Sequence, residues 1–226
     1  MGKFFLKLSR TGLLMMLFGA VFVAFAFQDT ITSLKAPKSF DDVMEEGAAA
    51  GDHVSGRIPY LLDAFASMET WTEDRSNNSR TPKKTSARYY VLPAGDDFIG
   101  LKVSSDNFSK ASDLVDQTYG FFSGAGEPTV ELVMDARVAV MEEELAQLFR
   151  EDLQDYYGYT DSDINAMGDL LVVEGRSFTA VRAICGIGAA LFLLGLVISI
   201  FRWRKISAEF RPAKPAAGSV SGPEIE

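Results

Sequence analysis

Two uncharged apolar segments near opposite ends of the chain constrain its fold more than any other feature. Residues 11–27 form seventeen uncharged positions and residues 183–201 form nineteen. At about 1.5 Å per helical residue these segments reach roughly 25 and 28 Å, close to the ~30 Å hydrocarbon core of a bilayer. A surface helix of a soluble protein is not apolar on every face. We therefore predict two transmembrane helices, at residues 11–31 and 179–201.

The first segment also has features of a cleaved signal peptide. Lys3, Lys7 and Arg10 precede it, and Ala24-Phe25-Ala26 offers an A-x-A cleavage site. The apolar run continues through Phe27, however, without the polar region that usually precedes cleavage. We expect a retained anchor, with cleavage as the alternative.

The charges on either side of these segments orient the chain. Residues 1–27 carry three basic and no acidic side chains, and residues 182–226 carry six basic and three acidic ones. The positive-inside rule therefore places both termini on the cytoplasmic side of a plasma membrane. Of the 22 basic and 31 acidic residues in the chain, 13 and 28 remain for residues 28–181, a net charge of −15. The predicted layout is a basic cytoplasmic N-terminus (1–10), a span (11–31), an extracytoplasmic domain (32–178), a second span (179–201), and a basic stop with a disordered cytoplasmic tail (202–226).

Cysteine use and charge restrict the cell type and the partners. The single cysteine, Cys185, lies in the second apolar segment, so the predicted external domain has no disulfide. A domain of about 150 residues can bury enough apolar surface without one, and this favours a bacterial membrane. The acidic surplus argues against nucleic acid, whose phosphates it would repel. The expected partners are the lipid bilayer and a membrane or envelope protein.

The central region mixes strand and helix patterns. Alternation and strand-forming residues predict strands within 53–71, in a hairpin over 88–103 that turns at 93–97, and at 129–134, and an apolar run predicts a last strand at 170–173. Helical spacing predicts a short helix capped by Ser39, a helix over 108–122, one from Met141 that stops at Gly158, and one capped by Thr160. Strand and helix do not alternate regularly. We predict an α+β fold, a mixed or antiparallel sheet with packed helices, flanked by the two transmembrane helices.

The predicted helices have apolar faces that we expect to be buried. On the 108–122 helix these residues are Phe108, Ala111, Val115, Tyr119 and Phe122. On the helix that stops at Gly158 they are Met141, Leu145, Leu148, Phe149 and Tyr156. In the apolar segments, the pairs Ala20 with Ala24 and Gly186 with Ala190 have the four-residue spacing that could let the two spans pack together or pair with another subunit.

Candidate catalytic groups are few. The single histidine, His53, excludes a multi-histidine metal site, and the P-loop and G-x-S-x-G patterns do not occur. His53 could serve as a base with a carboxylate such as Asp63, Asp96 or Asp97. A hydrogen-bonded structural histidine is the simpler interpretation, and Asp96 and Asp97 are typical turn residues. We assign no catalytic, cofactor-binding or metal-binding residue from the sequence.

Two other local patterns have an ordinary and a functional interpretation. Four residues have the spacing of positions one, three, five and nine of a calcium loop: Asp161, Asp163, Asn165 and Asp169. That loop needs glycine and glutamate where this chain has Ala166 and Val172, so we predict a helix start capped by Thr160 instead. Residues 73–86 carry four basic and two acidic side chains in an otherwise acidic region. We expect a mobile hairpin tip there, with contact to lipid headgroups or to an acidic partner as the alternative.

Three sequence runs carry a resemblance to known proteins. They are Gly56–Asp63 (GRIPYLLD), Tyr89–Pro93 (YYVLP) and Phe98–Val103 (FIGLKV). With this layout, most of residues 39–205 resembles uncharacterised two-pass bacterial membrane proteins that have an extracytoplasmic α+β domain. The resemblance implies a membrane location and no known activity.

Three functions are compatible with the sequence. The first is a membrane-anchored, non-enzymatic domain that binds or organises another envelope component. The second is a membrane-tethered hydrolase that uses Asp or Glu side chains with His53, and the third is an accessory subunit of a transporter or signalling complex. Convergence of His53 with Asp63, Asp96 or Asp97 in one pocket would favour the hydrolase, whereas their dispersal would favour the binding module.

Overall fold

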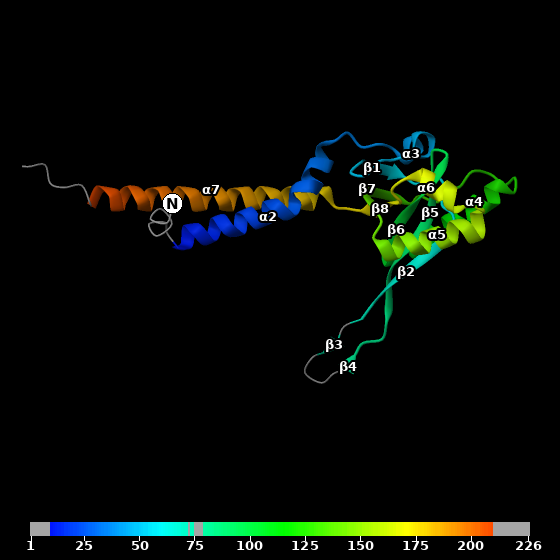
Figure 1. Cartoon of the computed structure of the whole chain (residues 1–226), viewed down its shortest axis with the longest axis horizontal. Coiled ribbons are helices and arrows are strands. Elements are labelled where there is room, and N and C mark those ends of the chain that lie inside the picture. The colour runs from blue at the N-terminus through cyan, green and yellow to red at the C-terminus, as the bar shows by residue number, and fades with distance from the viewer. Residues whose placement is uncertain (1–9, 72, 75–78, 210–226) are drawn as a thin grey trace, which may run out of the picture. The chain divides into compact units, whose positions relative to one another are not determined.

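The computed structural model of the chain describes residues 10–71, 73–74 and 79–209 (Figure 1). The chain divides into two compact units. One is a helical unit formed by Met1–Phe27 and Ala183–Glu226, and the other is a domain formed by Gln28–Arg182.

The domain is built on a six-stranded sheet in the order β1-β7-β8-β6-β5-β2. Its strands are β1 (His53–Arg57), β2 (Ala64–Thr70), β5 (Lys84–Ala94), β6 (Asp97–Ser104), β7 (Val133–Val140) and β8 (Leu171–Gly175). Strands β6 and β8 are parallel, and all other neighbours in this sheet are antiparallel. Two short strands, β3 (Glu73–Asp74) and β4 (Ser79–Arg80), pair separately. The mixed sheet with packed helices confirms the predicted α+β class.

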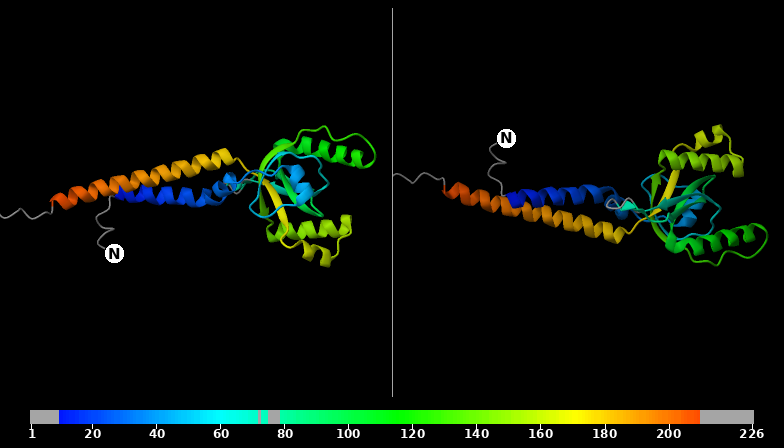
Figure 2. Two further views of the ribbon diagram at one scale, coloured as in Figure 1. Left: turned by 90° about the horizontal axis from the view of Figure 1, so that it is seen from above. Right: turned by 90° about the horizontal axis from the view of Figure 1, so that it is seen from below.

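Helices cover both faces of this sheet. Helices α3 (Phe40–Glu46) and α4 (Phe108–Phe122) pack on one face, and α5 (Glu143–Tyr157) and α6 (Asp161–Met167) pack on the other (Figure 2). Because side chains alternate along a strand, Val173 enters the core beneath α4 and its neighbour Val172 enters the core beneath α5. The domain therefore has two cores, one on each side of the sheet.

Two helices begin where their capping residues predict. Ser39 Oγ accepts a hydrogen bond from the Asp42 amide at 3.0 Å, and Asp42 returns one by accepting from the Ser39 amide at 2.9 Å. Thr160 and Asp163 make the same reciprocal pair at 3.3 and 2.8 Å. These bonds satisfy amides that a helix start leaves unpaired, and they lower the pKa of both aspartates. The Asp163 side chain thus belongs to the helix start.

The predicted hairpin over 88–103 is confirmed. Strands β5 and β6 pair from Ala87 with Ser104 to Ala94 with Asp97, so Gly95 and Asp96 alone form the turn. Gly95 has φ 61°, a left-handed conformation that glycine adopts without a steric penalty. The predicted turn at 93–97 was too wide, because Pro93 still pairs with Phe98 in the ladder.

Two other predicted strands needed correction. The alternating region 53–71 forms two strands, β1 and β2, which lie at opposite edges of the sheet. The chain leaves the ladder at Pro59, which has no N–H to donate. The strand predicted at 129–134 was also wrong in its bounds, because β7 begins at Val133 and runs to Val140.

The helical unit contains parts of α2 (Arg10–Leu34) and α7 (Phe178–Glu209), two helices that are long and apolar enough to cross a membrane. They approach closely at glycines. A Cβ atom built on Gly19 would lie 2.5 Å from the Gly188 carbonyl oxygen, and one built on Gly195 would lie 2.6 Å from the Gly12 carbonyl oxygen.

The small-residue pairs predicted from the sequence lie elsewhere. Ala20, Ala24 and Ala190 are exposed, and a Cβ on Gly186 would meet nothing within 4 Å. The contact between α2 and α7 repeats every seven residues instead of every four, at Gly12 and Gly19 on α2 and at Gly188 and Gly195 on α7. The pairs therefore do not join these two helices, and their contact with another subunit stays a prediction.

Candidate functional site

A cleft of about 500 Å³ opens at the β2 edge of the sheet. Three parts of the domain line it: the start of β2, the last turns of α4 and the last turns of α5. The lining residues are Asp63, Ala64, Phe65, Tyr119, Asp152, Tyr156 and Tyr157.

The packing of α5 positions the acidic side of this cleft. Phe149 and Leu153 are completely buried, and the Phe149 ring packs against Phe65 with centroids 4.8 Å apart. Because side chains three and four residues apart share a helix face, Asp152 lies one turn beyond Phe149 and beside Tyr156. The helix ends at Gly158, whose left-handed conformation (φ 72°) lets its amide donate to the Leu153 carbonyl. The same short segment therefore completes the core and lines the cleft.

A hydrogen bond runs across the cleft. The Tyr119 hydroxyl donates to Asp63 Oδ2 at 2.5 Å, and Tyr157 lines the cleft with these two residues. Burial, together with the bond to Asp63, raises the pKa of Tyr119 to about 12. Burial raises the pKa of Tyr157 as well. Both phenols therefore stay protonated at physiological pH and act as donors.

Asp152 is the residue of the cleft whose side chain lacks, in the described part of the chain, a hydrogen-bond partner for a buried oxygen atom. Burial, followed by repulsion from Asp63 and Asp155, raises the pKa of Asp152 from its ordinary value. Its Oδ2 atom is buried and has no hydrogen-bond partner among the described residues. Buried polar atoms in native proteins nearly always have a partner. The cleft therefore presents one unpaired acceptor next to a second carboxylate.

His53 lies far from this cleft in the strand order, on β1 at the opposite edge of the sheet. Its Nε2 atom is 2.7 Å from Asp135 Oδ1, and its ring packs edge-on against Phe178 with centroids 4.3 Å apart. His53 is buried in this arrangement. It therefore connects β1 to β7 and to the first residue of α7, and does not meet Asp63.

Like the His53 contacts, the ion pairs of Asp29 join separate segments of the domain. Asp29, near the end of α2, is 2.5 Å from Arg137 Nη1 and 3.9 Å from Arg176 Nε. Arg182 donates from its Nε to Ser33 Oγ at 3.0 Å. The pairs of Asp29 tie the last turns of α2 to β7 and to the residue after β8, and the Arg182 bond joins the first turns of α7 to the end of α2.

The other predicted carboxylates are dispersed. Asp96 lies in the β5–β6 turn, and Asp97 begins β6. Of the candidate catalytic residues His53, Asp63, Asp96 and Asp97, Asp63 alone lines the cleft. In the described parts of the chain no group of three or more His, Cys, Asp or Glu side chains is arranged to hold a metal ion.

Sequence reasoning missed three residues of the cleft: Tyr119, Asp152 and Tyr157. Tyr119 had been placed on the buried face of its helix, but its side chain is 41% exposed and its hydroxyl reaches Asp63. The one available signal was chemical. A tyrosine at the end of an apolar face carries a hydroxyl that needs a polar partner, which phenylalanine does not.

Comparison of the chain with curated proteins and with solved structures yields no significant match. A family model, in contrast, matches residues 2–201, which is most of the chain. The chain therefore belongs to the family described as Domain of unknown function (DUF8577).

Proposed function

We propose that this protein is a two-pass membrane protein whose extracytoplasmic domain binds a cationic group in the cleft, without catalysing a reaction. The observation that carries the proposal is the unpaired, buried Oδ2 atom of Asp152 beside the Asp63 carboxylate. The proposal also accounts for the four aromatic rings around these acids: Phe65, Tyr119, Tyr156 and Tyr157.

An ammonium group suits this combination of side chains. Carboxylate oxygens accept its hydrogen bonds or balance its charge, and the faces of aromatic rings attract cations. The net charge of −15 over residues 28–181 would raise the local concentration of cations around the domain. A lysine side chain of an envelope protein would make the domain an anchor or an accessory subunit, and a small quaternary amine would make it a ligand sensor.

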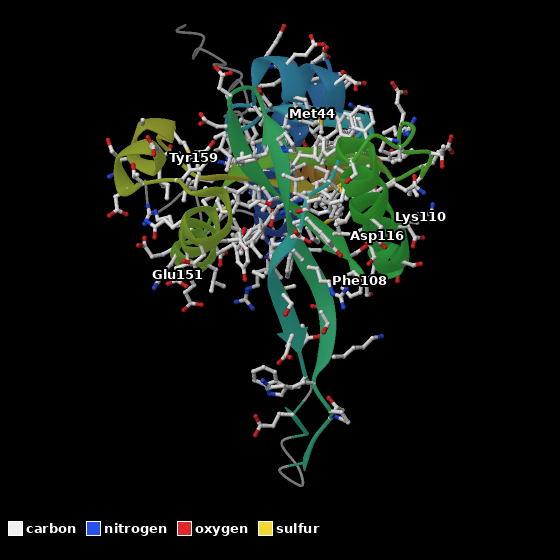
Figure 3. All side chains as sticks on the ribbon, turned by 90° about the vertical axis from the view of Figure 1, so that its right-hand side faces the viewer. Met44, Phe108, Lys110, Asp116, Glu151 and Tyr159 are labelled. Atoms are coloured by element: carbon white, nitrogen blue, oxygen red, sulfur yellow. The ribbon has the colours of Figure 1, made fainter. Side chains whose placement is uncertain are left out.

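The proposed topology rests on the two apolar helices and on the basic flanks at both ends of the chain. It is tested with single cysteines in a Cys185→Ser background. A membrane-impermeant maleimide is expected to label Asp116→Cys, on the exposed side of α4, in intact cells (Figure 3). Ser219→Cys in the tail should react only after permeabilisation. Labelling of the tail but not of α4 in intact cells would mean the opposite orientation.

Ligand binding is tested with choline and its neutral isostere 3,3-dimethylbutan-1-ol, added to the full chain in lipid nanodiscs. We expect choline to bind about tenfold more tightly, since the two differ only in charge and one cation–π or ion contact contributes on the order of 1 kcal/mol. Isothermal titration calorimetry measures the ratio. The affinity for choline should fall as the pH decreases through the raised pKa of Asp152, because protonation removes that carboxylate charge.

The matched variants carry equal changes of charge. Asp63→Asn with Asp152→Asn should abolish the preference for choline. Asp96→Asn with Asp97→Asn removes two carboxylates at the β5–β6 hairpin and should leave it intact. Equal affinities for choline and the isostere, or a preference that survives in the first variant, would contradict the proposal.

A hydrolase remains the second candidate, for one specific reason. A carboxyl group with a raised pKa beside a second carboxylate is the arrangement of a general acid with its partner. This hydrolase would use Asp152 and Asp63, since His53 lies at the other edge of the sheet. It predicts turnover of chromogenic esters, phosphoesters or glycosides that either Asp63→Asn or Asp152→Asn abolishes, whereas the binding module predicts none.

A further inference from the structure

Strands β2 and β5 continue past the rest of the sheet as a two-stranded arm. We define the arm by its described residues 68–71 and 83–87, which pair from Met68 with Ala87 to Thr70 with Lys84. The next strand, β6, ends at Ser104 opposite Ala87, so among the described residues no third strand accompanies the arm beyond this row. Figure 3 shows the arm extending away from the body of the domain.

The side chains of the arm are those of a membrane interface. Trp71 is 49% exposed and Met68 is 38% exposed. Lys83 Nζ lies 5.7 Å from the centre of the Trp71 ring and 2.8 Å from Glu69 Oε2. Tryptophan beside lysine is typical of segments at the headgroup level, where the ring is partly desolvated and the ammonium stays hydrated. An isolated two-stranded ribbon is marginally stable, so contact with a surface would stabilise it.

The arm leaves the sheet at the end from which the chain enters its second apolar helix. Strand β8 is parallel to β6 and ends at Gly175, just before α7 begins at Phe178. Strand β5 is antiparallel to β6, so its first residues, Lys84–Ala87, lie at that same end. The base of the arm is therefore close to the point where the domain continues into α7.

Charge separates the arm from the rest of the domain. Residues 68–71 and 83–87 carry two basic side chains, Lys83 and Lys84, and one acidic side chain, Glu69, within a region whose net charge is −15. At the base of the arm, Lys102 and Arg176 line a hollow of about 480 Å³, although both also pair with Glu174. An anionic surface would repel the body of the domain and attract this end of it.

We propose that the arm binds the anionic headgroup layer of the membrane that holds α2 and α7. Trp71 lies at the headgroup level, and Lys83 and Lys84 contact the lipid phosphates. This inference rests on the proposed membrane anchoring, which keeps the arm at a high effective concentration near the bilayer, so that weak contacts suffice.

The experiment uses the full chain with Trp203→Phe, which leaves Trp71 as the only tryptophan of the two in the sequence. The protein is reconstituted in vesicles of phosphatidylcholine, alone or mixed with phosphatidylglycerol, and emission is recorded with lipids brominated near the headgroup. We expect a blue shift and quenching in the mixed vesicles, both reduced by high salt, because salt screens exposed charges. Emission should be close to aqueous in phosphatidylcholine alone.

Matched variants distinguish binding by the arm from a general effect of the protein's charge. Lys83→Glu with Lys84→Glu should reduce quenching in mixed vesicles to the level in phosphatidylcholine. Lys110→Glu, on α4 away from the arm, should leave quenching unchanged (Figure 3). Flotation of the vesicles in alkaline carbonate reports insertion independently. A chain that does not float overturns the anchoring and the arm contact together, whereas a chain that floats with aqueous Trp71 emission in both lipid mixtures overturns the arm contact alone.

Discussion

Replacing Phe149 with alanine is expected to lower the free energy of unfolding of the domain by about 3–5 kcal/mol. Phe149 is completely buried beneath α5, where it packs against Phe65 and shares a core with Val91 and Val172. Its removal leaves a cavity that the rigid sheet cannot fill. Urea unfolding of the full chain in detergent measures the change. The choline preference should fall as well, since Phe149 holds the helix that carries Asp152.

Its neighbour Leu148 provides the matched control. Leu148 is 45% exposed, so Leu148→Ala should cost less than about 1 kcal/mol. Each substitution removes a large apolar side chain, and the two positions are adjacent on one helix. Only Phe149 faces the sheet. Similar losses for the two variants would mean that α5 packs with another face and that Asp152 does not line the cleft.

The comparison of these two residues shows what periodicity can and cannot determine. The sequence predicted the end of this helix at Gly158 correctly. Its expected buried face included Phe149, which is buried, and also Leu148 and Tyr156, which are exposed, and it omitted the buried residues Ala146 and Leu153. Apolar residues occur on more of the circumference than the sheet covers, because α5 also lines an open cleft. Spacing alone therefore identified the helix but not its rotation.

Local interactions explain the predictions that succeeded. The caps at Ser39 and Thr160 and the β5–β6 turn depend on residues no more than a few positions apart. The class of the fold followed from the order of such elements. These features depend on short stretches of sequence, in which local hydrogen bonds and backbone preferences determine the structure.

Long-range pairing explains what the sequence could not supply. The positions of β1 and β2 at opposite edges separate His53 from Asp63, although the two residues are close in the chain. The same topology brings Asp63 near Tyr119 and Asp152, which come from two helices on opposite faces of the sheet. No pattern within one segment contains that information, since it depends on which strand lies at the edge.

The residues at the contact between α2 and α7 were not predicted, for a different reason. Small residues four positions apart are a familiar sign of close packing, and the chain has such pairs at Ala20 with Ala24 and Gly186 with Ala190. The observed glycines recur every seven residues on both helices. A seven-residue repeat keeps one seam facing the partner when helices pack with a left-handed twist. Both spacings occur in the sequence, and only the partner helix selects between them.

Gly19→Leu is expected to destroy this seam. Its new Cβ would lie 2.5 Å from the Gly188 carbonyl oxygen and 2.6 Å from the Phe192 amide nitrogen, both backbone atoms, so the two helices must separate. Overpacking of this kind costs about 1–3 kcal/mol, and more where backbone blocks the way. Energy transfer between probes on α2 and α7 during titration with SDS measures the loss. Ala20→Leu adds the same side chain at the adjacent, exposed position and should leave the titration midpoint unchanged. Equal midpoints for the two variants would show that the helices do not meet at Gly19, because an exposed face tolerates leucine whereas a glycine contact tolerates none.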